Sequence, residues 1–347
     1  MYRDCLPMVV LLSAVCLSLE AQGPRAPFTE KDLDLGKQLV ATAAEIRAQI
    51  TDPSGPAEPF KVIGNLYMVG DANGSAYLLT SPQGHILLGA GYVNASEAIQ
   101  KNIESLGFKM TDIKVILLNH SHPDVSGGAA YMKEKTGAQI MAGFAEVPFL
   151  EHRGAPPAAP NVGGRGPGQP GGRAPGAQGG QPNLGARGGG GRPVPPVKVE
   201  RALYDGDVVK VGPLSVTAYL APGHSPASTS WLFTVRDGGH NYRVFEFCCW
   251  EFPEDISRSP YINEASVHHT FETWRKVLPI DIYLENGIYG WGGVLNQPSG
   301  TILERIARLK ADSKLAVNPN IFRGFAAARE AEFEEKLAKL KASSSTN

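Results

Sequence analysis

Two short histidine-containing segments constrain this sequence more than any other feature. Residues 120–124 read His-Ser-His-Pro-Asp and begin one residue after the end of the apolar run 115–118. A strand that ends in a tight loop there would direct His120, His122 and Asp124 toward one point. Imidazole and carboxylate are ligand types that catalytic zinc sites use, with one coordination position left open for water. The segment therefore predicts a zinc site at the end of a strand.

A second segment supplies the matching piece far downstream. Residues 221–231 read Ala-Pro-Gly-His-Ser-Pro-Ala-Ser-Thr-Ser-Trp and follow the β-rich run 214–220. Two strand-end loops would then bring His224 to the same edge of a β structure as the first pair of histidines. The remaining histidines are predicted to be surface or packing residues: His85, His152, His240, His268 and His269.

Taken together, these segments and the motifs around them resemble the metallo-β-lactamase superfamily and, within it, the β-lactamases of subclass B3. The resemblance covers nearly all of residues 59–340. It implies an α/β fold, the αββα sandwich, in which two sheets pack face to face with helices outside. The motifs that carry it are residues 60–70, 77–91, 205–207 with the segment leading to His224, and 317–340.

The chain departs from the family pattern at three positions. The family motif is H-x-H-x-D-H, and its last histidine is replaced here by Val125. The family's final zinc histidine would fall at Gly287, after the strand 281–284, and its outer aspartate would fall at Gly89. The resemblance therefore implies a complete first zinc site, made of three histidines, and a second site that keeps only Asp124 of its usual ligands.

Two adjacent cysteines offer a replacement ligand for the second site. Cys248 and Cys249 end the β run 242–247, where other β-lactamase subclasses place a zinc-binding cysteine and subclass B3 has a serine. Strand alternation lets one of the pair face the site, and the alignment favours Cys248. A small buried thiol is the alternative interpretation. Glu246 and Glu285 are weaker candidates for the same role.

The N-terminus has the pattern of a secretory signal peptide over residues 1–21. Arg3 precedes the apolar stretch 6–19, and the small residue Ala21 follows it. This stretch is too short for a typical membrane span. We therefore expect a protein without a membrane anchor that is periplasmic or secreted.

The rest of the chain divides by composition. Residues 22–58 are predicted to form a helical extension, capped by Thr29, and a linker. Residues 59–342 form the metallo-β-lactamase-like domain, and 343–347 are a polar tail. The Gly- and Pro-rich insertion 154–196 has almost no large apolar side chains and is predicted to be disordered. A lid or an arm that binds polyanions is the alternative for this insertion.

Three functions remain open from the sequence. The first is an exported hydrolase of the B3 type. Zinc held by the three histidines would lower the pKa of its bound water to ~7, and Asp124 would act as the catalytic base during attack on a β-lactam-like amide carbonyl. The second is a lactonase or thioesterase of the same superfamily. The third is a non-catalytic relative that binds metal or ligand. The net charge of −1 gives no reason to expect nucleic acid as a partner; we expect a small-molecule substrate and a monomer.

Overall fold

The computed structural model describes residues 27–73, 76–152, 193–222, 224–247, 263–285 and 299–344, with residues 293, 295 and 297 in addition. The predicted signal peptide, Cys248 and Gly287 lie outside this part of the chain. Within it, no helix combines the length and apolar character that a membrane span requires.

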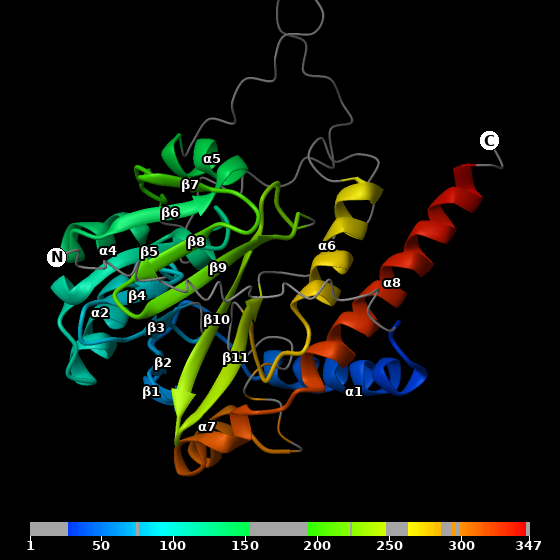
Figure 1. Cartoon of the computed structure of the whole chain (residues 1–347), viewed down its shortest axis with the longest axis horizontal. Helices are drawn as coiled ribbons and strands as arrows, with labels where there is room; N and C mark the ends of the chain where they lie inside the picture. The colour runs from blue at the N-terminus through cyan, green and yellow to red at the C-terminus, as the bar shows by residue number, and fades with distance from the viewer. Residues whose placement is uncertain are drawn as a thin grey trace, which may run out of the picture.

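Two β-sheets form the centre of the fold (Figure 1). The first sheet is antiparallel from β1 to β4 and parallel from β4 to β7. Its strands follow chain order: β1 (Phe60–Ile63), β2 (Leu66–Met68), β3 (Tyr77–Leu79), β4 (His85–Leu88), β5 (Ile113–Leu118), β6 (Gln139–Gly143) and β7 (Arg201–Leu203). The second sheet has the order β12 (Ile282–Glu285), β11 (His240–Phe247), β10 (Thr229–Asp237), β9 (Leu214–Leu220) and β8 (Val208–Val211).

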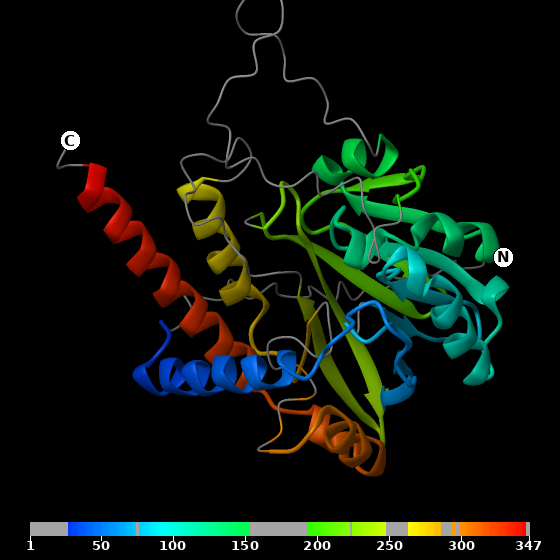
Figure 2. The ribbon, with the colours of Figure 1, turned by 180° about the vertical axis from the view of Figure 1, so that it is seen from behind.

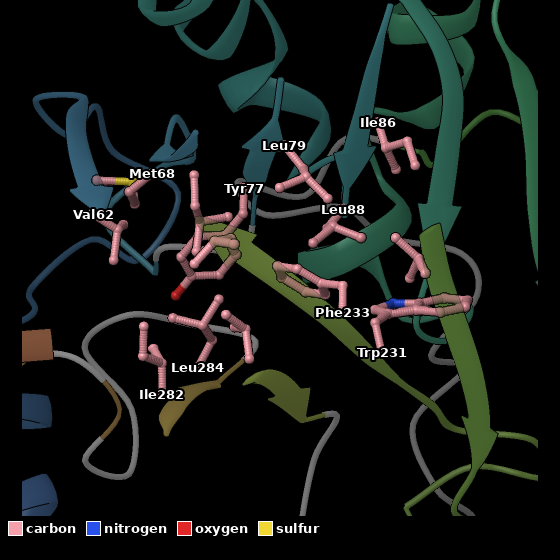
Figure 3. Close-up of a cluster of buried hydrophobic side chains, with 14 of the residues drawn as sticks. Val62, Met68, Tyr77, Leu79, Ile86, Leu88, Trp231, Phe233, Ile282 and Leu284 are labelled. Atoms are coloured by element: carbon pink, nitrogen blue, oxygen red, sulfur yellow. The ribbon is translucent and has the colours of Figure 1, made fainter. Parts of the chain in front are cut away.

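The inner faces of the two sheets share one apolar core. Successive side chains of a strand point to opposite faces, so Val115 and Leu117 of β5 enter this core while Ile116 and Leu118 point away from it. Figure 3 shows the packing between side chains of the first sheet (Val62, Met68, Tyr77, Leu79, Ile86, Leu88) and those of the second (Trp231, Phe233, Ile282, Leu284). The two sheets are therefore packed face to face.

Helices bury the outer faces of both sheets. On the first sheet, α2 (Ser96–Ser105) and α4 (Ala129–Thr136) contribute Ile99, Ile103 and Met132 to a second apolar cluster. The second sheet is covered by α1 (Glu30–Arg47), α6 (Glu264–Val277) and α8 (Ile321–Ser344), as Figures 1 and 2 show from opposite sides. The layer order is helix, sheet, sheet, helix, which confirms the predicted αββα sandwich. Shorter helices are α3 (Pro123–Ser126), α5 (Val147–Glu151) and α7 (Ile302–Ala311).

The predicted N-terminal helix belongs to this outer layer. Thr29 caps α1 through a capping box with Asp32, as the sequence predicts. The helix crosses α8 where Gly36 meets Gly324, and a Cβ atom added at Gly36 would lie 2.1 Å from the carbonyl oxygen of Gly324. Leu39 on α1 is buried in the apolar cluster that α1, α6 and α8 form on the outer face of the second sheet. Glycine at the crossing therefore lets the two helix backbones approach closely.

The end of the predicted insertion lies against the body of the protein. Of residues 154–196, the structure describes 193–196, and Val194 among them is buried. Val197 is also buried, and its backbone N–H donates to the carbonyl oxygen of Leu150 at 3.0 Å. These contacts lead the chain into β7 beside β6.

Candidate metal centre

The first two histidines of the candidate centre follow the carboxyl end of the parallel strand β5. His120 is fully buried, and His122 is half-buried at the position that precedes α3. The carbonyl oxygen of His122 accepts hydrogen bonds from the backbone N–H of Val125 and Ser126 and from the Ser126 hydroxyl. Pro123, which lacks an N–H, begins this helix, where an N–H would have no helical partner. The short helix therefore fixes the backbone that carries His122.

His224 comes from the loop between β9 and β10 and completes a cluster of three imidazoles. The ring centroids lie 4.5 to 4.9 Å apart, and each pair of rings is close to perpendicular. The Nε2 atom of His224 is 2.8 Å from the Nδ1 atom of His122. One nitrogen from each ring lies within 4.8 Å of the others, so His120, His122 and His224 could hold one metal ion. The structure thus brings together the three histidines that the sequence predicts.

Asp124 lies at the edge of this cluster. Its Oδ1 atom is 4.0 Å from the Nε2 atom of His120, and its side chain is partly exposed. Tyr92 lies nearby, and its pKa is held above its usual value by burial and by the carboxylates of Asp124 and Asp71. Asp124 therefore lies beside the buried histidine, with its own side chain partly open to solvent.

The positions of the family's second metal site carry little ligand chemistry. Val125 is fully buried and has no ligand atom. Gly89, at the family's outer aspartate position, has a φ of +76° and donates its backbone N–H to Leu117 at 2.8 Å. The predictions for Cys248 and Gly287 fall outside the described residues. In the part of the chain that the structure describes, the three-histidine cluster is the one group that could hold a metal.

The weaker acidic candidates have other surroundings. Burial raises the pKa of Glu246 to about 8, although a hydrogen bond from Asn119 acts in the opposite direction. Glu285 is also buried, at the end of β12. Neither residue belongs to the metal-binding cluster. Away from the cluster, His85 packs edge-on against Phe108, and His268 pairs with Glu334, in agreement with the predicted packing and surface roles.

Two polar residues that the sequence analysis did not select connect the histidine loops. The Asn119 side-chain amide donates to the carbonyl oxygen of Thr229 at 2.9 Å, and the Thr229 backbone N–H donates to the carbonyl oxygen of Asn119 at 2.8 Å. Glu146 accepts hydrogen bonds from Ser121 and Ser225. Both polar residues follow the ends of neighbouring parallel strands, β5 and β6, and this shared edge is the signal that could have identified them.

Comparisons with known proteins agree with this geometry. The family described as the metallo-beta-lactamase superfamily matches residues 69–237. The metallo-beta-lactamase SMB-1, in a complex with mercaptoacetic acid, is 30% identical, with 83% of this chain and 99% of that chain covered and a TM-score of 0.64. The subclass B3 metallo-beta-lactamase BJP-1 of Bradyrhizobium japonicum is 28% identical, with 85% and 98% covered and a TM-score of 0.63. A Cronobacter sakazakii metallo-beta-lactamase with a HARLDQ motif is 25% identical, with 86% and 94% covered and a TM-score of 0.64.

Proposed function

Since the chain belongs to the metallo-β-lactamase superfamily, we propose that it is an exported zinc-dependent hydrolase that opens amide rings of the β-lactam type. The observation that carries this proposal is the convergence of His120, His122 and His224 within 4.8 Å. The similarity to subclass B3 enzymes over most of the chain supports the choice of substrate class.

Zinc fits the donor set of this centre. Three imidazoles are a ligand set that catalytic zinc sites use, and they leave a coordination position for a small molecule. When bound, zinc supplies Lewis acidity that polarises a carbonyl group and lowers the pKa of water. The partly exposed Asp124 side chain, 4.0 Å from His120, would orient the attacking water and accept its proton. Water adds across the amide bond, and the ring nitrogen leaves as the amine.

We expect about one tightly held zinc per chain. Val125 is buried and offers no ligand at the family's second site. The HARLDQ motif of the Cronobacter sakazakii relative is comparable, because it also begins with His, has Asp fifth and does not end with His. Cys248 remains our candidate for any second ion.

A second candidate function is a non-catalytic metal-binding relative. The loss of ligand chemistry at Val125 favours it, because the second metal contributes to substrate binding in the enzymes that the chain resembles. The retained cluster of three histidines with Asp124 beside it favours the hydrolase. A lactonase or thioesterase is the third candidate. The enzymes of this kind that the chain resembles use an aspartate to bridge two metals where this sequence has Phe247, Cys248 and Cys249, so this candidate is the weakest on sequence.

Export is part of the proposal and rests on the sequence of residues 1–21. Expression of the full chain in a Gram-negative host, followed by cell fractionation and N-terminal sequencing, tests it. We expect mature protein in the periplasm that begins near residue 22. Full-length protein confined to the cytosol would contradict this part.

The reaction is tested on the purified protein with a panel of β-lactams, lactones and thioesters. We expect about one zinc per chain by elemental analysis, weak hydrolysis of β-lactams, and inhibition by mercaptoacetic acid. His122→Ala should lose both zinc and hydrolysis. His240→Ala, at an exposed hairpin position, is the matched control and should lose neither. A zinc-loaded protein that hydrolyses none of the β-lactams would overturn the proposed substrate class, and hydrolysis of lactones or thioesters instead would identify the third candidate.

A further inference from the structure

Glu146 is a fully buried glutamate placed between the two loops that carry the histidines. It follows β6 by three residues and begins the turn into α5. Its Oε2 atom accepts a hydrogen bond from the backbone N–H of Ser121 at 3.0 Å. Its Oε1 atom accepts from the Ser225 hydroxyl at 2.6 Å and from the backbone N–H of Ala227 at 2.9 Å. Each carboxylate oxygen therefore serves one loop.

These contacts are adjacent to the proposed metal ligands. Ser121 lies between His120 and His122, and Ser225 directly follows His224. From these contacts we infer that Glu146 is a positioning residue, which holds the two histidine loops in register so that three imidazoles meet at one metal ion. The inference rests on the proposed metal site and names a residue outside the ligand set that would control its affinity.

The physical reason is the cost of ordering the ligands. The loops of His122 and His224 are 102 residues apart in the chain, so their relative position depends on contacts between them. A loop that is already fixed does not lose conformational freedom when the metal binds. Partners that orient metal ligands typically contribute 10–100-fold to metal affinity. Removing Glu146 should therefore weaken metal binding.

A second link between the loops should keep such variants folded. Asn119 and Thr229 exchange a pair of hydrogen bonds beside the site, one from the Asn119 side chain and one from the Thr229 backbone. This pair does not involve Glu146. The loops would thus stay attached to the fold while losing the contacts next to the histidines.

Glu146→Gln is the most specific variant. Each carboxylate oxygen accepts a backbone N–H, from Ser121 on one side and Ala227 on the other. The glutamine amide nitrogen must then face one of these donors, so one loop loses its contact whichever way the amide turns. Glu151→Gln is the matched control, because Glu151 lies on the next turn and also accepts a backbone N–H, from Val199 at 2.9 Å, outside the site.

The experiment measures zinc affinity by competition with a chromophoric chelator, together with the visible absorption spectrum of the Co²⁺-substituted protein. We expect Glu146→Gln to lower zinc affinity about 10-fold or more and to change the Co²⁺ spectrum. The metal-free variant should still unfold cooperatively, with a thermal midpoint lowered by the loss of one buried hydrogen bond. Glu151→Gln should retain both wild-type affinity and spectrum. Glu146→Asp, which keeps the charge but is one methylene shorter, should fall between wild type and Glu146→Gln.

Wild-type affinity and an unchanged spectrum in Glu146→Gln would overturn the inference, as would a wild-type protein that binds no metal. If Glu146→Gln does not fold, Ser225→Ala removes a single contact to Glu146 and should weaken zinc binding in the same direction; no change there would also overturn it. These measurements do not depend on turnover. A protein that shows the affinity loss yet hydrolyses no substrate supports the positioning role while the proposed reaction fails.

Discussion

The side-chain amide of Asn119 donates a 2.7 Å hydrogen bond to the Glu246 carboxyl group across the two sheets. Asn119 follows β5 of the first sheet, and Glu246 lies on β11 of the second. Burial of Glu246 raises its pKa to about 8, and the bond from Asn119 offsets part of this rise. The carboxyl group is therefore mostly protonated in the folded protein at neutral pH.

This raised pKa predicts a loss of stability with rising pH. A folded-state pKa above the unfolded value of 4.5 means that the folded protein retains the proton between pH 4.5 and about 8 while the unfolded chain releases it. The stabilising contribution is full below pH 4.5 and is lost as the pH rises to about 8. Glu246→Gln should remove this dependence. The free energy of unfolding of the variant should therefore rise relative to that of the wild type by at most ~1.4 kcal/mol per pH unit between pH 4.5 and about 8.

Urea unfolding of the metal-free wild type and Glu246→Gln at pH 5, 6.5 and 8 measures this difference. Glu264→Gln is the control, because Glu264 is a surface residue of α6. The free energy of unfolding of this variant should change with pH in the same way as that of the wild type. Parallel curves for Glu246→Gln as well would mean that Glu246 ionises in the folded protein as it does in water.

A second contact between the sheets involves Tyr77 of β3. Its hydroxyl donates to the backbone carbonyl oxygen of Glu285, the last residue of β12, at 3.1 Å. Tyr77→Phe should lower the free energy of unfolding by about 1 kcal/mol, because a buried hydrogen bond is lost while the ring stays packed. Tyr131→Phe, whose hydroxyl bonds to Gln100 on the helical surface, should cost less. Equal losses for the two variants in denaturant unfolding would contradict a special role for the contact between sheets.

The crossing of α1 and α8 gives a packing prediction at Gly36. Alanine is the better helix former by about 1 kcal/mol, but its Cβ would lie 2.1 Å from the Gly324 carbonyl oxygen. Overpacking of this kind typically costs about 1–3 kcal/mol, so Gly36→Ala should destabilise the protein. Gln38→Ala, at an exposed position of the same helix, is the control and should be near neutral. Higher stability for Gly36→Ala would show that the helices separate readily at this crossing.

The fold followed from the sequence where the period of apolar residues and the family motifs agreed. Residues 115–118 are apolar without interruption because β5 is buried on both faces, between the inner core and α2 and α4. Thr29 predicted the start of α1 because a capping side chain acts on its own helix turn. The position of α1 against α8 was not predicted, because the Gly36–Gly324 approach joins residues far apart in sequence.

The residues of the candidate site were likewise predicted only in part from the sequence. His120, His122 and His224 were predicted because metal ligands keep a recognisable residue type and spacing. Asn119 and Glu146 were not, because their role comes from hydrogen bonds to backbone groups of distant loops. Their position after neighbouring strands places both residues at the edge that carries the histidines, but the backbone groups that they bind are known only from the three-dimensional arrangement.

The last prediction concerns the missing second-site ligands. Val125→His together with Gly287→His restores the two histidines of the family pattern. We expect a second equivalent of zinc and, because a second ion would bind the substrate and stabilise the amine leaving group, a rise in kcat of about 100-fold, or ~2.7 kcal/mol of transition-state stabilisation. Val125 is fully buried, so the larger side chain should also lower the thermal midpoint.

Elemental analysis and steady-state kinetics of four proteins resolve this prediction: the wild type, the double variant, Val125→His alone, and Val125→Ala. Val125→Ala separates the loss of the buried valine from the gain of a ligand, and it should bind one zinc with wild-type kcat. Cys248→Ser in the double-variant background then reports whether Cys248 contributes to the second ion, since loss of one zinc equivalent would assign it as a ligand. If the double variant binds two zinc ions and kcat for β-lactams does not rise, the missing histidines do not limit the reaction, and the natural substrate belongs to another class of carbonyl compound.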